Sequence, residues 1–324
     1  MLQTVRAVFV VIASMLVALS AQAQVYPSKP VRLIVPYPAG GGTDFFARAV
    51  GAQLSQQLGQ QILVENRPGA ATIIGAEAVA KSAPDGYTLL LGDTATFAVN
   101  PSLYKKLPYD PGKDLTPITM TGRFALLLVV NPAKLKSTSV KELVEEAKKY
   151  PGKFDYASPG PGSPHHLAME MFKQRTDTQM THVPYKGAGP AIQDLLSGQI
   201  PLMFLDLAAG APQIKAGKLK ALAVASDKRI AALPDLPTVA ESGLAGFEAW
   251  AWQALAVPVG TPREIVARLN AEFRKAVSVP ELRQKLIDAG IDPLQSSPED
   301  ASAYIRSEAL KWSKVISDGR ITVE

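Results

Sequence analysis

The chain has 324 residues, of which 47% are hydrophobic and 19% charged, a composition that fits a globular protein and excludes an intrinsically disordered one. Its formal net charge is +5, but lysine and arginine are scattered without interleaved aromatic residues, so nucleic acid is not an expected partner. The absence of cysteine excludes disulfides, thiolate metal sites and lipid attachment to a cysteine.

The first residues predict an export signal. Arg6 and the free amine form a short positive region, residues 7–19 are apolar, and Ala21 and Ala23 supply small residues at a cleavage point. A membrane helix needs about 20 apolar residues and this stretch is shorter, which leaves an uncleaved anchor as the weaker alternative. We therefore expect a Sec signal peptide over residues 1–23, cleaved near Ala23, and a mature protein that is soluble in the periplasm.

From Tyr26 onward, short apolar runs alternate with segments of helical spacing. The apolar runs predict strands. The predicted strands are residues 31–35, 62–65, 87–91, 126–130, 154–157, 181–183, 202–204 and 219–225.

Between and after these runs, apolar residues recur every three to four positions, which predicts helices with one buried face. The predicted helices lie within residues 46–58, 140–150, 265–277 and 301–316. Gly59 follows the first of them as a C-cap, and Ser139 starts the second.

The alternation of helices with nearly continuous apolar strands predicts an α/β protein with parallel-rich sheets covered on both faces. Two lobes are expected if the chain crosses near residue 122 and returns near residue 226. Lobe 1 would then comprise residues 24–122 and 226–324, and lobe 2 residues 123–225. The sequence has no heptad pattern, so a monomer is expected.

A glycine loop follows the first predicted strand and reads PYPAGGGTD at residues 36–44. Ligands of open α/β sheets bind beside such turns, glycines let a ligand approach the backbone, and free N–H groups at a helix start favour an anion. Nucleotide binding is the weaker alternative. A phosphate loop requires Lys followed by Ser or Thr where this chain has Thr43-Asp44. A dinucleotide-binding loop requires a glycine where this chain has Phe45. Only Glu65 fits the dinucleotide-binding pattern, at the position of the acid that binds the ribose.

A second glycine loop reads SPGPGS at residues 158–163, and Ser163 and Pro164 have the residue types of a helix N-cap and first position. A third loop, KGAG at residues 186–189, precedes a helix predicted to begin at Pro190. Helix starts from two lobes, pointed at one cleft, would clamp a small anion. The alternative is that these are the ordinary strand-to-helix turns of any α/β protein.

Metal and catalytic alternatives are weaker. His165 and His166 are adjacent, so on a helix they diverge by roughly 100° and cannot face one metal together. His182 is distant, and no carboxylate lies at ligand spacing. Ser163 and His166 could serve an exported hydrolase, but Pro161 stands where the nucleophile elbow requires glycine.

Several longer stretches resemble a known family. They read PSKPVRLIVPYPAGGGTD at residues 27–44, VENRPGAATIIGAEAVAKSAPDGYTLLLG at 64–92, NPSLYKKLPYDPGKDLTPIT at 100–119, HVPYKGAGPAIQDLLSGQI at 182–200 and LPDLPTVAESGLAGFEAWAWQAL at 233–255. In these stretches the chain resembles the extracytoplasmic solute receptors of tripartite tricarboxylate transporters, also called Bug-type or TctC-type receptors. The resemblance covers essentially the whole mature chain.

The resemblance implies a two-lobed periplasmic binding protein fold of type II-like form, in which two parallel-rich sheets flanked by helices enclose a ligand cleft between the lobes. It implies a non-catalytic receptor without a cofactor. The expected ligand is a small organic carboxylate, such as a di- or tricarboxylate, an acidic amino acid or an aromatic acid. The expected partners are the membrane permease subunits of a tripartite transporter, or a sensor if the protein serves only signalling.

The resemblance also implies that both glycine loops contact the ligand. The ligand-binding residues carried over by position are Tyr37, Ala39, Gly41, Gly42, Thr43, Asp44, Thr94, Thr96, Ser158, Gly160, Gly162, Ser163 and Asp206. Asp206 would meet the variable far end of the ligand. The sequence departs from the commonest family pattern in the prolines of the second loop, at Asp93-Thr94 and at residues 206–209. These departures leave the far group of the ligand open.

Overall fold

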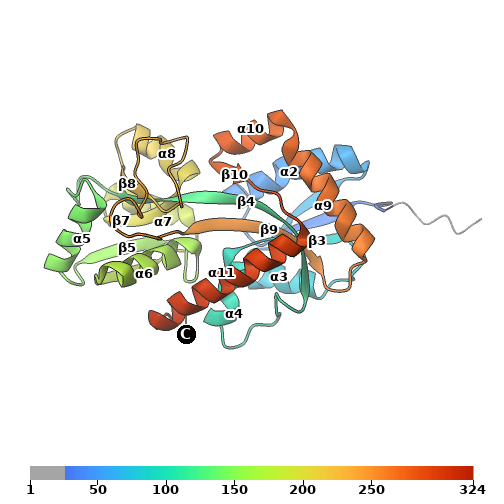
Figure 1. Cartoon of the computed structure of the whole chain (residues 1–324), viewed down its shortest axis with the longest axis horizontal. Helices are drawn as coiled ribbons and strands as arrows, with labels where there is room; N and C mark the ends of the chain where they lie inside the picture. The colour runs from blue at the N-terminus through green and yellow to red at the C-terminus, as the bar shows by residue number, and fades with distance from the viewer. Residues whose placement is uncertain (1–25, 324) are drawn as a thin grey trace, which may run out of the picture.

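The computed structural model describes residues 26–323. The signal peptide expected at residues 1–23 therefore lies outside the described residues. Within the described range, no helix is long and apolar enough to cross a membrane. Two groups of strands and helices lie side by side along the long axis of the molecule (Figure 1).

Lobe 1 is the group that contains the start of the described chain. Its strands are β1 (Val31–Val35), β2 (Ile62–Asn66), β3 (Thr88–Asp93), β9 (Trp250–Pro258), β10 (Ile291–Pro293) and the first part of β4 (Leu115–Val130). Its helices are α2 (Gly42–Leu58), α3 (Ile73–Ala80), the π-helical turn η1 (Ala95–Val99), α4 (Asn100–Leu103), α9 (Arg263–Ser278) and α10 (Pro280–Asp288). Strand β1 runs parallel to β2 and β3, so the loop after β1 and the end of β3 lie at the same edge of the sheet.

Lobe 2 is the second group. Its strands are the rest of β4, β5 (Phe154–Ser158), β6 (Met180–Pro184), β7 (Leu202–Asp206) and β8 (Lys220–Val224). Its helices are α5 (Val140–Lys149), α6 (Pro164–Thr176), α7 (Ala188–Ser197) and α8 (Leu207–Lys215). Strand β5 runs parallel to β6 and β7, so these three strands end at one edge of the sheet.

Strand β4 joins the two lobes within the strand order β2-β1-β3-β9-β4-β7-β5-β6. Residues 115–125 pair antiparallel with β9, residues 126–130 with β7 and residues 127–130 with β8. The chain returns beside this crossing: the Ala225 N–H donates to the Leu126 carbonyl at 2.8 Å, and the Ala249 N–H donates to the Ala225 carbonyl at 2.8 Å. The two lobes are thus joined by neighbouring backbone segments.

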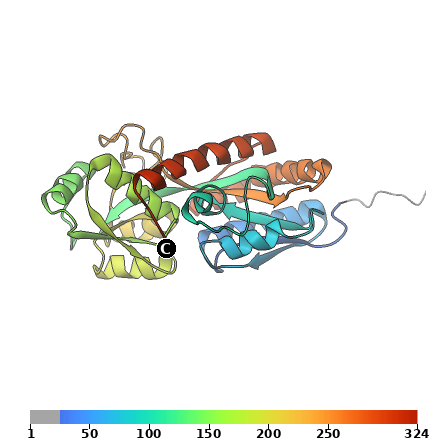
Figure 2. The same ribbon diagram turned by 90° about the horizontal axis from the view of Figure 1, so that it is seen from below.

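Helix α11 (Pro298–Asp318) lies along the junction and packs against both lobes (Figure 2). Its Glu308 carboxylate accepts hydrogen bonds from Trp252 Nε1 of β9 at 2.8 Å and from Trp312 Nε1 at 2.9 Å. On lobe 2, Gln174 Nε2 of α6 donates to the Val315 carbonyl of α11 at 2.9 Å. The helix therefore ties the two lobes together from one side.

Every predicted strand and helix overlaps an observed element, with small differences at the ends. The predicted start of the helix after residue 187 is wrong, because α7 begins at Ala188 and not at Pro190. The sequence analysis missed β9, β10 and the first part of β4. Pro117 and Gly122 suggest breaks in the sequence, but both lie at irregularities in the β4–β9 register, where a strand tolerates them.

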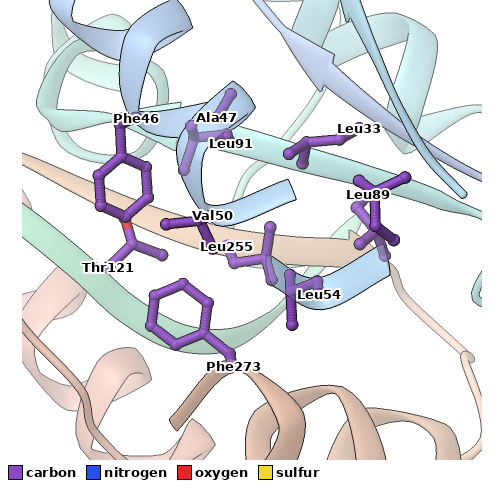
Figure 3. A pocket seen from close by; sticks show the side chains of 11 residues that line it. Leu33, Phe46, Ala47, Val50, Leu54, Leu89, Leu91, Thr121, Leu255 and Phe273 are labelled. Atoms are coloured by element: carbon purple, nitrogen blue, oxygen red, sulfur yellow. The ribbon is translucent and has the colours of Figure 1, made fainter. Parts of the chain in front are cut away.

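The core of lobe 1 encloses a small void of about 10 Å³ between α2, α9 and the sheet (Figure 3). Its lining is apolar apart from Thr121, whose hydroxyl has no hydrogen-bond partner among the described residues. A buried water needs roughly 10–15 Å³ and two to four polar partners, which one hydroxyl does not supply. The void is a packing defect next to Phe46 and Phe273, and it is not the site of a ligand.

The buried Glu308 network predicts a stability effect. We expect Glu308→Leu to lower the free energy of unfolding by about 2–5 kcal/mol, because it removes the acceptor of two buried indole N–H groups. The matched control is Glu145→Leu on α5, where the carboxylate side chain is 65% exposed. Urea unfolding measures both variants. A loss below about 0.5 kcal/mol in Glu308→Leu would contradict the role given to this network.

Candidate functional site

The first glycine loop runs from the end of β1 into α2, and Asp44 holds its shape. The Asp44 carboxylate accepts hydrogen bonds from the Gly40 N–H at 2.9 Å, from Asn66 Nδ2 at 3.0 Å and from Arg48 Nε at 3.0 Å. Burial raises the pKa of Asp44, but the hydrogen bonds from Arg48, Gly40 and Asn66 outweigh it and leave the pKa below its ordinary value. The structure therefore gives Asp44 a positioning role within its own loop.

The start of α2 leaves backbone donors available. Gly41 is the N-cap residue and Gly42 begins the helix, and no side chain caps their N–H groups. Ala39, Gly41 and Gly42 are exposed, and nothing lies within 4 Å of the position a Cβ would take on Gly41. Thr43 is held from lobe 1, because Gln253 Nε2 of β9 lies 2.6 Å from its hydroxyl. The start of α2 is therefore exposed at Gly41 and Gly42, while Thr43 is held in place by β9.

Tyr37 lies between the glycine loop and the end of β3. Its hydroxyl donates a short hydrogen bond to Asp93 Oδ2, and Asp93 Oδ1 accepts from the Thr96 N–H at 3.0 Å and from the Thr96 hydroxyl at 2.9 Å. Burial raises the pKa of Asp93, against the hydrogen bonds from Tyr37 and Thr96. Burial also raises the pKa of Tyr37 well above its ordinary value, and the charges of Asp93 and Asp206 add to the rise.

Thr94 and Thr96 are buried completely, and their hydroxyls bond to the protein. The Thr94 hydroxyl accepts from the Trp252 N–H of β9 at 3.1 Å, and the Thr96 hydroxyl lies 2.9 Å from the Thr72 hydroxyl. The structure thus places both threonines behind the surface that Tyr37 presents. Their direct contact with a ligand remains a prediction.

The second glycine loop, between β5 and α6, is held by its own hydroxyls. The Ser163 hydroxyl caps α6 by accepting from the His166 N–H at 3.3 Å, and it donates to the Gly160 carbonyl at 2.8 Å. The Ser158 hydroxyl accepts from the Gly160 N–H at 3.1 Å and lies 2.6 Å from His182 Nε2. Gly160 and Gly162 have φ values of +145° and +74°, which favour glycine.

A stack of rings supports this loop from below. The rings of His166 and His182 are 3.9 Å apart, and Tyr156 stacks on His182 at 5.0 Å. The Tyr156 hydroxyl donates to Glu170, and His166 Nδ1 accepts from the Gly162 N–H at 3.1 Å. Burial lowers the pKa of His166 to about 3 and that of His182 to about 4.

The sequence analysis missed this stack. His182 comes from β6 and Tyr156 from β5, and the two residues are direct partners in the β5–β6 register. Only the register brings them together, so the spacing of residues along the chain gave no signal. The available hint was the parallel pairing of the two predicted strands, together with His166 in the first turn of the next helix.

The two lobes meet beside the two loops. A Cβ on Gly162 of lobe 2 would come within 2.6 Å of Leu103 Cδ2 and 3.5 Å of Val99 Cγ1, which both belong to lobe 1. Asp206, at the end of β7, lies close enough to Tyr37 to affect its pKa, and His165 Nε2 lies 3.2 Å from Asp206 Oδ1. The structure therefore brings Tyr37, Asp206 and the start of α6 to one junction.

Two buried side chains at this junction keep polar atoms without a hydrogen-bond partner in the described chain. Gln253 is 2% exposed, and one atom of its amide holds Thr43 while the other has no partner. His165 is 7% exposed, and neither of its ring nitrogens makes an aligned hydrogen bond. Buried polar groups normally have partners, so both side chains retain unused hydrogen-bonding capacity at this junction.

The geometry does not support a hydrolase at Ser163. A nucleophile needs its hydroxyl hydrogen-bonded to a basic ring nitrogen. The Ser163 hydroxyl instead donates to the Gly160 carbonyl, and His166 Nδ1 is occupied by the Gly162 N–H. Among residues 26–323, no three His, Asp or Glu side chains are grouped so that they could hold a metal ion.

Comparison with known proteins gives matches over nearly the whole chain. A family model described as "Tripartite tricarboxylate transporter family receptor" matches residues 46–320. Protein BugT of Bordetella pertussis is 38% identical over 303 residues, which cover 93% of this chain and 93% of BugT.

Solved structures of similar proteins also match nearly the whole chain. The Rpa4515 protein of R. palustris, solved with adipate, is 37% identical with a TM-score of 0.85, and the match covers 92% of this chain and 99% of that one. MatC (Rpa3494) of Rhodopseudomonas palustris, solved with bound malate, is 33% identical with a TM-score of 0.81 and coverages of 90% and 100%.

The buried histidine stack predicts a pH dependence of stability. Both folded pKa values lie below the unfolded value of about 6.5, so the unfolded state binds more protons and stability falls as the pH falls from about 7 towards 4. We expect the protein to lose on the order of 2–4 kcal/mol of unfolding free energy between pH 7 and pH 5. Chemical unfolding at the two pH values measures this loss.

The variant His182→Gln separates the stack from other titrating groups, since glutamine can still bond to Ser158 but does not titrate. We expect it to remove about half of the pH dependence. An unchanged difference between pH 7 and pH 5 in His182→Gln would show that the stack is not its source.

Proposed function

We propose, because the chain belongs to the tripartite tricarboxylate transporter receptor family, that it captures a small organic carboxylate between its two lobes and delivers it to the membrane permease of such a transporter. The chain is a solute-binding receptor with the two-lobed fold of periplasmic binding proteins, and it is not an enzyme. Relatives solved with adipate and malate support a carboxylate as the ligand. Export to the periplasm, directed by residues 1–23, is part of the proposal.

The observation that carries the proposal is that each lobe has a glycine-bearing loop that leads from a parallel strand into a helix start. The N–H groups of a first helical turn have no partner within the helix, and the helix dipole adds positive potential there. Such a start is a ready site for a carboxylate. Gly41, Gly42 and Thr43 offer it on α2. On α6 the N–H groups of Gly160, Gly162 and Ser163 bond within the protein and Pro164 has none, so the donor left open among the described residues is the His165 N–H. The structural support is that Gly162 of the second loop lies beside Leu103 and Val99 of lobe 1, and that the charge of Asp206 in lobe 2 acts on the pKa of Tyr37 in lobe 1.

Closure requires a hinge, and we place it at the crossing of β4, close to the expected lobe boundaries at residues 122–123 and 225–226. Arg123 anchors this point: its Nε donates to Asp292 at 2.9 Å, and its guanidinium lies 3.9 Å over the Trp250 ring. A ligand that contacts both loops binds only one arrangement of the lobes and shifts the equilibrium towards it.

A ligand screen tests the function. We expect at least one carboxylate to raise the melting temperature of the mature protein by several degrees, because a ligand at about 100 times its Kd adds about 2.7 kcal/mol of stability. Differential scanning fluorimetry against carboxylates, amino acids and sugars measures the shift. A response to sugars with none to any carboxylate would refute the proposal.

The contact of Gly162 with lobe 1 tests whether binding uses this arrangement of the lobes. We expect Gly162→Ala to lower ligand affinity about tenfold or more, because the new Cβ would lie 2.6 Å from Leu103 Cδ2 of the opposite lobe. Gly152→Ala is the matched control: its φ of +72° is nearly that of Gly162, but nothing lies within 4 Å of its Cβ position. Isothermal titration measures both. Equal affinities of the two variants would contradict the proposed closure.

A further inference from the structure

The net positive charge of the described chain lies on lobe 2. Residues 123–225 contain 13 lysine and arginine side chains but only 8 aspartate and glutamate side chains, which gives this lobe a net charge of +5. The rest of the described chain, residues 26–122 and 226–323, contains 20 side chains of each sign and is neutral overall. A charge asymmetry between two halves of a molecule indicates a surface that meets a partner of opposite charge.

The lysines of lobe 2 gather at the end of the lobe that lies away from its glycine loop. Strands β5, β6 and β7 end at the edge that carries this loop. Strand β4 ends and β8 begins at the opposite edge, where Val130 pairs with both Leu202 and Lys220. Helix α5 lies across this opposite edge, at one extreme of the long axis of the molecule (Figure 1). We call residues 131–153 and 215–220 the far end of lobe 2, and they contain nine lysines.

The acidic side chains at the far end leave most of these lysines unpaired. Glu142 and Glu146 accept hydrogen bonds from the loop before α5, and Glu145 lies 3.9 Å from Lys141. This contact is the one ion pair that a far-end lysine forms within residues 26–323. The neighbouring turn before β6 adds one further acid, Asp177. Eight of the nine lysines are therefore available to an external anion.

The turn that follows α5 presents an aromatic ring among lysines. It reads KKYPGK at residues 148–153, and each of its residues is exposed. The ring of Tyr150 has Lys153 Nζ at 4.5 Å and Lys149 Nζ at 5.3 Å from its centroid. Tyrosine has an apolar ring and a polar tip, and this combination is enriched at the interface between a membrane and water. The turn therefore combines cations with a side chain suited to that interface.

A groove opens at the same end of the lobe, beside the start of β8. It has a volume of about 460 Å³, and its lining is apolar apart from Lys220 and Asp235. The charge of Lys220 also acts on α5, because it adds to the hydrogen bonds from Thr138 that lower the pKa of Glu142. The groove and the start of α5 therefore lie close together, and the far end places apolar surface next to lysines.

We propose that the far end of lobe 2 binds reversibly to a membrane surface that contains anionic phospholipid. Lysines that are spread over a whole end of the lobe, and not gathered in one pocket, match the many phosphates of a bilayer surface. The ammonium groups bind these phosphates, while Tyr150 and the apolar groove meet the boundary of the acyl chains. Because the glycine loop lies at the opposite edge of lobe 2, the receptor can take up its ligand while it is bound to the membrane.

Vesicle binding tests the proposal with the mature protein. The probes are vesicles of phosphatidylglycerol and phosphatidylcholine in equal parts, and vesicles of phosphatidylcholine alone. We expect co-sedimentation in low-salt buffer to show at least about tenfold stronger binding to the anionic vesicles, because several lysines act on one surface. Raising the salt from about 0.01 M to about 1 M should abolish the difference, since it shortens the Debye length from about 30 Å to about 3 Å.

Two triple variants locate the contact. The far-end variant replaces the lysines of the turn after α5 by glutamine: Lys148→Gln, Lys149→Gln and Lys153→Gln. The matched control removes the same charge from exposed positions of α9 and α10 in lobe 1: Arg263→Gln, Arg274→Gln and Arg283→Gln. We expect the far-end variant to bind anionic vesicles about tenfold or more weakly, and the control to stay within about threefold of the unchanged protein.

Thermal melting checks that both variants fold, and isothermal titration with a carboxylate should give both the affinity of the unchanged protein. If the far-end variant does not fold, Lys215→Gln with Lys218→Gln supplies the same test beside β8. Salt-sensitive binding to anionic vesicles that is lost in the far-end variant and kept in the control supports the proposal.

Two results would overturn it. Equal losses in the far-end variant and the control would show that binding follows the net charge of the protein alone. No binding to anionic vesicles would leave the lysines to an acidic protein partner. The proposal does not depend on which carboxylate binds, so a failure of every carboxylate in the ligand screen would refute the proposed function and leave this proposal in place.

Discussion

Backbone N–H groups at the starts of α2 and α6 are the feature on which this account of the protein depends. At α2 no side chain covers these groups at Gly41 and Gly42. At α6 the N–H groups of Gly160, Gly162 and Ser163 bond within the protein, so the His165 N–H is the donor left open among the described residues. The rest of the fold positions these N–H groups. Parallel pairing brings each loop to the carboxyl edge of its group of parallel strands, and β4 pairs with strands of both lobes and so connects them.

The loops keep their shape because buried groups hold them from behind. Asp44 binds the backbone of the first loop, and His166 binds the backbone of the second at Gly162. These side chains resemble ligand contacts in the sequence, since they are polar and adjoin glycines. In the structure their hydrogen-bonding capacity is used within the protein, so their effect on binding operates through the position of the loops. Rigid support of this kind lowers the entropy lost when a ligand binds.

Local sequence signals predicted much of this arrangement. The C-cap at Gly59 and the N-caps at Ser139 and Ser163 depend on a few neighbouring residues, and all three are confirmed. Contacts that depend on how strands pair could not be predicted from the sequence. The stack of His182 on His166 and the hydrogen bond from Gln253 to Thr43 join residues that are far apart in the chain. Which of the predicted residues contact a ligand stays a prediction, and the burial of Thr94 and Thr96 favours a supporting role for both.

The proposed function requires that one anion is bound by backbone donors from both lobes. The most direct measurement is a titration of ¹⁵N-labelled protein with a binding carboxylate, followed through the amide signals of Gly41, Gly42, Gly162 and Ser163. The account predicts that the signals from both loops shift with one common midpoint. Shifts confined to one loop, or different midpoints for the two loops, would contradict the claim that one anion is held by both.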